Sequence, residues 1–194
     1  MASRKVEIER KTRETDISLT LDPDIAAEPA VRTGIPFFNH MLTSMSFHGR
    51  FFLSVEGRGD IDVDPHHLVE DVGLVLGQAF FLVLEKAGPV ARFGHAVVPM
   101  DEALSEVIID VCGRPTLSLH ATFPQAFAGT FDLSLLREFF AGLSSQARIS
   151  LHVDLRRGEN SHHMAESAFK ALGKALKQAY SPDGREMSSK GRIG

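Results

Sequence analysis

The sequence lacks three things: cysteine pairs, long apolar runs and an excess of positive charge. Its single cysteine, Cys112, cannot form an internal disulfide, and a reducing compartment fits it best. No apolar run approaches the ~20 residues of a membrane span, and residues 1–13 are charged, unlike a signal or transit peptide. The net charge of -4 argues against nucleic acid or a membrane surface as a partner. We therefore expect a soluble, cytoplasmic protein.

Hydrophobic periodicity and stop signals divide the 194 residues into two halves with a similar order of elements. The first half is expected to contain strands at 6–10, 17–21 and 51–56, loops at 22–34 and 57–65, and helices at 37–47 and 66–86. The second half is expected to contain strands at 104–111, 116–122 and 149–153, and helices at 131–143 and 161–179. The last helix should begin at a cap formed by Asn160 or Ser161.

The two halves also align residue by residue, which indicates an ancient duplication. Superimposing them pairs His66 with His162, His67 with His163, Glu70 with Glu166, Gly77 with Gly173 and His40 with Glu138. Each half, 1–90 and 91–180, should be a small, mostly antiparallel sheet with helices packed on one face, an α+β layout. A pseudo-twofold axis should relate the halves within one compact domain, and the polar tail at 181–194 should be flexible.

The element His-His-x-x-Glu occurs twice, at 66–70 and at 162–166, each time at the start of a predicted helix. Residues i and i+4 share one helix face, so the first histidine and the glutamate of each copy can bind one ion. The second histidine points roughly 100° away and must serve something else. Imidazole and carboxylate ligands without thiolates suit manganese, iron, zinc or nickel.

The pseudo-twofold axis predicts two equivalent metal sites, each completed by the second histidine of the other helix. One set is His162, Glu166, His67 and His40, and the other is His66, Glu70, His163 and Glu138. Four protein ligands leave one or two positions of an octahedral ion open, as a catalytic metal requires. The alternative is that these residues only cap helices and make surface hydrogen bonds, although both copies keep them while most neighbours differ.

Several short runs, in order over nearly the whole chain, resemble the imidazoleglycerol-phosphate dehydratase family of histidine biosynthesis. They are Gly-Ile-Pro-Phe-Phe-Asn-His-Met-Leu (34–42), His-His-Leu-Val-Glu-Asp (66–71), Arg-Phe-Gly (92–94), Asp-Glu-Ala-Leu (101–104), Gly-Arg-Pro (113–115), Asn-Ser-His-His-Met-Ala-Glu (160–166) and Ser-Ser-Lys-Gly (188–191). The resemblance implies an α+β fold of the ribosomal protein S5 domain 2-like type and a manganese-dependent hydro-lyase. It also implies a homo-oligomer, a 24-subunit shell built from trimers, with sites shared between subunits.

The resemblance also implies a ligand set for two manganese ions in each active site. The family's ligands map onto His40, His66, His67, Glu70, His162, His163 and Glu166. The position of Glu138 is often histidine in the family, and glutamate can also bind manganese. Asn39, next to His40, stands where aspartate is commoner, so a hydrogen bond behind that ligand is expected to differ.

The implied reaction removes water from imidazole glycerol phosphate and gives imidazole acetol phosphate. The C–H bond that breaks has no carbonyl beside it, so we expect the ring, held between two metals as imidazolate, to expel the hydroxyl. A carboxylate must then move the proton. The resemblance assigns this role to Glu14, which can reach the site from another subunit, and Glu166 can share it.

The phosphate of such a substrate requires cations and hydroxyl donors. The resemblance assigns them to Arg92, Arg114, Ser188, Ser189 and Lys190. The last three lie on the tail and are expected to close over the phosphate as a lid. Lys170, one turn after Glu166, and His48, two turns after His40, are also expected to touch the substrate.

Two other functions use the same residues. A dinuclear metal phosphohydrolase would use the open metal positions to activate water. A non-catalytic metal-binding shell would hold the ions without turnover. A ferritin-like di-iron oxidase fits poorly, because its motif is Glu-x-x-His on a four-helix bundle and this chain is rich in strands.

Overall fold

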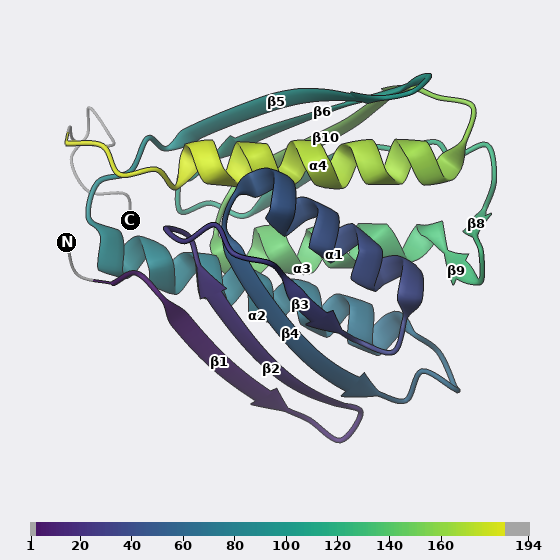
Figure 1. The fold of residues 1–194 in the computed structure, drawn as a ribbon, viewed down its shortest axis with the longest axis horizontal. Coiled ribbons are helices and arrows are strands. Elements are labelled where there is room, and N and C mark those ends of the chain that lie inside the picture. The colour runs from purple at the N-terminus through teal and green to yellow at the C-terminus, as the bar shows by residue number, and fades with distance from the viewer. Residues whose placement is uncertain (1–2, 185–194) are drawn as a thin grey trace.

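The computed structural model describes residues 3–184, and in it four helices lie between two four-stranded sheets (Figure 1). The first half contains β1 (Val6–Lys11), β2 (Thr15–Asp22), β3 (Ala30–Arg32), α1 (Pro36–Gly49), β4 (Phe52–Gly59) and α2 (His66–Ala87). The second half contains β5 (Phe93–Met100), β6 (Ala103–Asp110), β7 (Thr116–His120), β8 (Phe127–Ala128), β9 (Phe131–Asp132), the 3-10 turn η1 (Leu133–Leu135), α3 (Leu136–Ala147), β10 (Ser150–Arg157) and α4 (Ser161–Ala179).

The two sheets share one topology, which confirms the predicted duplication. Their strand orders are β1-β2-β4-β3 and β5-β6-β10-β7. All pairings are antiparallel except β3 with β4 and β7 with β10. The strands β6 and β7 are therefore the counterparts of β2 and β3, and the helices of each half cover the inner face of its sheet.

The prediction missed two edge strands, β3 and β5. β3 has three residues, mostly exposed, and is defined only by its parallel pairing with β4, which no local pattern reveals. β5 contains Gly94 and Pro99, and its outward residues include the exposed apolar side chains of Phe93 and Val97. This pattern obscures the alternation expected of a half-buried strand, and proline is tolerated there because β5 is an edge strand. The predicted loop at 57–65 also begins too early, because β4 continues to Gly59.

The predicted helix at 131–143 starts too early. Phe131 pairs with Ala128 in the small β8–β9 hairpin instead. The side chain of Asp132 then accepts a hydrogen bond from the Ser134 backbone N–H and starts η1, so that α3 begins at Leu136. The prediction for α4 is confirmed, because the Asn160 side chain accepts hydrogen bonds from the backbone N–H groups of the next turn.

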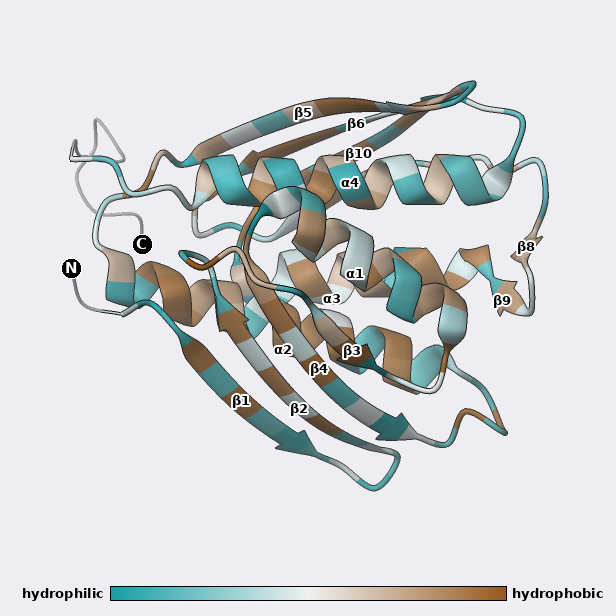
Figure 2. Ribbon diagram, viewed as in Figure 1, coloured by the Kyte–Doolittle hydropathy of each residue, from teal (hydrophilic) through white to brown (hydrophobic). Residues whose placement is uncertain are grey.

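Apolar residues of both halves form one core between the sheets. Figure 2 shows the hydropathy alternating along β2 and β4, while α2 is apolar over much of its length. α2 has 22 residues and is long and apolar enough to cross a membrane, but 61% of its most apolar window is buried inside the protein. It is therefore the core helix that packs between the first sheet and α3.

The two halves interlock through close helix pairs, α1 with α4 and α2 with α3. A Cβ added to Gly173 would lie 2.0 Å from the carbonyl oxygen of Met45, and one added to Gly77 would lie 2.6 Å from that of Leu143. Only glycine allows the backbones to approach so closely. Gly77 and Gly173 are repeat partners, so the duplication preserved the same contact on both sides of the pseudo-twofold axis.

Tyr180 carries a buried polar atom that the fold does not use. Its hydroxyl has no hydrogen-bond partner among the described residues and lies in the core, with its ring 4.8 Å from that of Phe80. Burial raises the pKa of this hydroxyl. Because an unpaired buried hydroxyl costs about 1–3 kcal/mol, we expect Tyr180→Phe to increase the free energy of unfolding by about 1 kcal/mol in a denaturant titration. A Tyr180→Phe chain less stable than wild type would contradict this.

Candidate metal and active site

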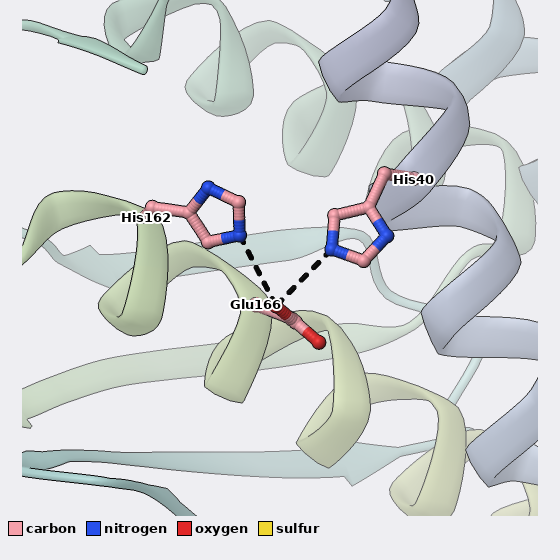
Figure 3. A group of neighbouring side chains, drawn as sticks. All are labelled: His40, His162 and Glu166. Carbon is pink, nitrogen blue, oxygen red and sulfur yellow. Dashed lines mark hydrogen bonds and ion pairs between the residues drawn. The ribbon is translucent and has the colours of Figure 1, made fainter. Parts of the chain in front are cut away.

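Two histidines and a glutamate meet between α1 and α4 (Figure 3). The Nε2 atoms of His40 and His162 lie 3.1 and 3.2 Å from Oε2 of Glu166. The ligand atoms of the three residues all lie within 4.8 Å of one another, and no other such group of three is found in residues 3–184. Two ligands at right angles on an ion with bonds of about 2.1 Å are about 3 Å apart, so this set fits a metal ion.

Local structure explains why these three side chains meet. His162 and Glu166 are one turn apart at the start of α4, and the close contact at Gly173 brings α1, with His40, against them. Glu166 is only 7% exposed, and Lys170 Nζ binds its second oxygen, Oε1, at 2.9 Å. Burial pushes the pKa of Glu166 upward, but hydrogen bonds from Lys170 and His40 outweigh it, and the net pKa is lowered. Glu166 is therefore a carboxylate with Oε2 directed at the histidines.

The second copy of the motif does not gather a comparable cluster within one chain. His66 Nε2 and Glu70 Oε2 lie 3.6 Å apart on α2, as their spacing predicts. Glu138 lies in the first turn of the neighbouring helix α3, but no hydrogen bond or ion pair joins it to His66 or Glu70 among the described residues. The geometry therefore supports the first predicted ligand set more strongly than the second.

A single chain does not bring the second histidines into the two predicted ligand sets. His67 does not join His162 and Glu166: its Nδ1 lies 3.2 Å from both carboxylate oxygens of Asp60. His163 does not join His66 and Glu70. The reason is that each second histidine turns away from the helix pairs toward a nearby loop carboxylate.

Glu102 is the carboxylate that binds His163. The Nδ1 atom of His163 lies 2.9 Å from Glu102 Oε2. This hydrogen bond and those from backbone amides lower the pKa of Glu102 to about 2, and Glu102 in turn raises the pKa of His163. The hydrogen bond to Asp60 raises the pKa of His67 in the same way. Asp60 and Glu102 were not among the predicted site residues, although Asp60 lies six residues before His66 and Glu102 lies in the turn between β5 and β6.

The structure places Glu14 near His67 and places His48 and Lys170 together. Glu14 is exposed in the turn between β1 and β2, close enough for its charge to raise the pKa of His67. Burial, together with the nearby charges of Lys170 and Lys174, lowers the pKa of His48. Lys170, expected to touch the substrate, is engaged with Glu166.

Arg92 and Arg114 lie at the opposite end of the chain's fold from the cluster. The Arg92 backbone N–H donates to the carbonyl of Ala179, the last residue of α4, and Ala179 is about 20 Å along the helix from Glu166. The Arg92 side chain is paired with Asp110, at 2.7 Å between Nε and Oδ1. The Arg114 carbonyl accepts a hydrogen bond from Ser150, at the start of β10. Ser188, Ser189 and Lys190 lie outside the described residues.

The Asn39 side chain makes no hydrogen bond to His40 among the described residues, and it binds Thr33 instead. Its side-chain oxygen accepts hydrogen bonds from the backbone N–H and the hydroxyl of Thr33, at 2.9 and 2.6 Å. The residue thus fixes the chain between β3 and α1, and an aspartate could accept the same two hydrogen bonds.

Fold and site define a duplicated α+β protein with a set of two imidazoles and one carboxylate of the kind that binds a metal ion. Residues 33–176 match the family model of imidazoleglycerol-phosphate dehydratase. The chain is 46% identical over 185 residues to the imidazoleglycerol-phosphate dehydratase of Acidithiobacillus ferrooxidans, covering 95% of this chain and 93% of the relative. It is 47% identical over 186 residues to that of Alkalilimnicola ehrlichii, covering 96% and 94%.

Solved structures of the same enzyme have the same fold. The crystal structure of imidazoleglycerol-phosphate dehydratase from Staphylococcus aureus matches with a TM-score of 0.84 and 36% identity, covering 92% of this chain and 99% of that one. The enzyme from Pyrococcus furiosus, solved in complex with (S)-C348, matches with a TM-score of 0.83 and 34% identity, covering 95% and 99%. The chain belongs to the imidazoleglycerol-phosphate dehydratase family, and is therefore a hydro-lyase of histidine biosynthesis.

Proposed function

We propose that this chain, in the cytoplasm, dehydrates D-erythro-imidazole-glycerol phosphate to imidazole acetol phosphate at a site that holds two Mn²⁺ ions. The observation that carries the proposal is the convergence of His40, His162 and Glu166 from two helices. His40, His162 and Glu166 would hold one of the ions, and the ions, when bound, would act as Lewis acids that stabilise negative charge on the substrate's imidazole ring. Imidazole nitrogen and carboxylate oxygen both suit Mn²⁺.

The remaining proposed ligands would bind metal ions together with residues from a second copy of the chain. They are His66, His67, Glu70, Glu138 and His163. The side chains of His67 and His163 are 39% and 25% exposed, and their Nδ1 atoms are already bound by carboxylates, so Nε2 is the atom available to an ion. A neighbouring subunit's cluster could use them, which supports a homo-oligomer, for which we propose 24 subunits built from trimers.

Glu14 is the proposed group that moves the proton. Its side chain has no hydrogen bond or ion pair among residues 3–184, and it lies near His67. Glu166 can share the role, but Lys170 and the two histidines occupy its oxygens. A general acid or base must be free to reach the reacting carbon, which favours Glu14.

The proposed phosphate ligands would act on a neighbouring subunit's site. Arg92, Arg114, Ser188, Ser189 and Lys190 form this set, with His48 and Lys170 proposed near the rest of the substrate. A distance of about 20 Å along α4 separates the Arg92 end from Glu166. Arginine and hydroxyl groups from another subunit would hold the phosphate by charge-assisted hydrogen bonds.

Manganese content and product analysis of the purified full-length chain test the proposal. We expect two Mn²⁺ per active site after reconstitution, and conversion of imidazole glycerol phosphate to imidazole acetol phosphate without release of inorganic phosphate. Phosphate release would favour the dinuclear phosphohydrolase. Stable metal binding with no turnover of the substrate would favour a metal-binding shell.

Mn²⁺ affinity is expected to fall as the pH is lowered. The fall should begin at a pH above the usual pKa of a histidine side chain. Asp60 and Glu102 raise the pKa values of His67 and His163 above 6.5, so both rings still carry a proton at a pH where ordinary histidines have lost it. Each displaced proton costs up to about tenfold in affinity per pH unit below its pKa. Calorimetric titration of the metal-free chain with Mn²⁺ at about pH 6 and about pH 8 measures this. Equal affinities at the two pH values would contradict it.

A further inference from the structure

Glu102 makes two kinds of contact at the start of α4, and they differ between its oxygens. Oε1 accepts hydrogen bonds from the backbone N–H groups of Glu159 and Asn160, at 3.1 and 2.8 Å. Oε2 faces Nδ1 of His163 at 2.9 Å. The backbone amides therefore fix which oxygen meets the imidazole, and the imidazole nitrogen that meets it must carry a hydrogen.

Asp60 makes the corresponding contact with His67 from an unrelated position. It follows β4 in the loop before α2, whereas Glu102 lies in the turn between β5 and β6. The repeat counterpart of that turn is the β1–β2 turn, which carries Glu14. The duplication thus does not explain the second contact, because a different segment supplies the carboxylate in each half.

We propose that Asp60 and Glu102 are positioning residues that hold Nδ1–H of His67 and His163, so that Nε2 is unprotonated and directed toward a metal ion. The inference rests on the proposed metal site. A carboxylate behind a histidine ligand fixes its tautomer and ring orientation, and its loss costs about 10–100-fold in metal affinity. Asp101 Oδ2 lies 3.7 Å from Nε2 of His163, and its side chain is 76% exposed, so it can move aside when an ion binds.

Glu102→Gln is the sharpest test, because the two backbone amides decide the orientation of the new amide group. Its oxygen must stay with the N–H groups of Glu159 and Asn160, which leaves the NH₂ group facing Nδ1 of His163. Nδ1 must then accept, so the ring hydrogen moves to Nε2 and blocks the metal position. The start of α4 keeps both of its backbone hydrogen bonds.

Asp60→Asn should behave differently. Both oxygens of Asp60 are 3.2 Å from His67 Nδ1, and no hydrogen bond to another residue's N–H is found for either among the described residues. The asparagine can therefore turn its oxygen toward Nδ1 and preserve the tautomer, whereas Asp60→Ala removes the acceptor. Glu106→Gln is the matched control, because Glu106 also binds a histidine, His95, at 2.7 Å, but on the exposed face of the second sheet.

The experiment titrates Mn²⁺ into the metal-free full-length variants by calorimetry and records their melting temperatures. We expect Glu102→Gln and Asp60→Ala to lower the affinity for an ion by about 10–100-fold, Asp60→Asn by less than about threefold, and Glu106→Gln not at all, with similar melting temperatures. The Asp60 pair tests the inference even if Glu102→Gln does not fold. The inference would be overturned, with the proposed function left standing, if Glu102→Gln and Asp60→Ala bound Mn²⁺ with wild-type affinity. Equal losses of affinity in Asp60→Asn and Asp60→Ala would have the same consequence. A wild-type chain that binds no Mn²⁺ would instead refute the proposed function and the inference with it.

Discussion

Replacing Glu166 by glutamine is expected to lower the rate of dehydration by about 10²–10⁴-fold and to weaken the binding of one Mn²⁺ ion. Oε2 of Glu166 is the point at which His40 and His162 converge, and Oε1 is held by Lys170. A glutamine would keep its oxygen on the Lys170 ammonium group. Its NH₂ group would then face the two histidines, where it cannot bind a metal ion.

Steady-state kinetics and metal analysis of the purified Glu166→Gln chain measure this effect. Glu9→Gln is a suitable control, because Glu9 is an exposed carboxylate on β1, outside the candidate site. The melting temperature shows whether the loss is one of folding. A Glu166→Gln chain that retains the wild-type rate and both ions would remove Glu166 from the site.

The second large effect concerns the contact between α1 and α4. We expect Gly173→Ala to lower the free energy of unfolding by about 3 kcal/mol, at the upper end of overpacking effects. The added methyl group would lie 2.0 Å from the Met45 carbonyl, which is backbone and cannot rotate away. A loss of this size corresponds to a fall of about 6–12 °C in melting temperature for a chain of this length.

Two other glycines provide the comparison for Gly173→Ala. Gly77→Ala meets the Leu143 carbonyl at 2.6 Å and should cost less. Gly184 has open space around it, so Gly184→Ala should leave the melting temperature nearly unchanged. Because α1 carries His40, Gly173→Ala should also reduce Mn²⁺ affinity. A melting temperature equal to that of wild type would show that the helices can separate without cost.

The sequence was sufficient to predict the features that depend on local periodicity. The four helices, the cap at Asn160 and the i, i+4 pairing of His162 with Glu166 all follow from spacing along the chain. The duplication then linked α1 to α4, and His40 does lie beside Glu166. The strand β3 could not be predicted in this way, because its only signature is a long-range pairing with β4.

The parts of the site that depend on loop conformation were beyond such reasoning. Helical geometry correctly turns His67 and His163 away from their glutamates, but it does not specify what they meet. Asp60 and Glu102 reach them from turns whose paths no periodic pattern describes. Sequence motifs likewise do not reveal that Arg92 lies near the end of α4 remote from Glu166.

The cross-packing of the helices also governs how the protein unfolds. α2 and α4 each cover the sheet of their own half, and α3 and α1, the shorter helices of the opposite halves, pack chiefly on α2 and α4 respectively. Neither repeat can lose its structure without exposing the apolar surface of its partner, and a hydrophobic core shared in this way makes partial unfolding costly. The chain is built from two copies of one unit, yet we expect the two copies to unfold together in a single thermal transition.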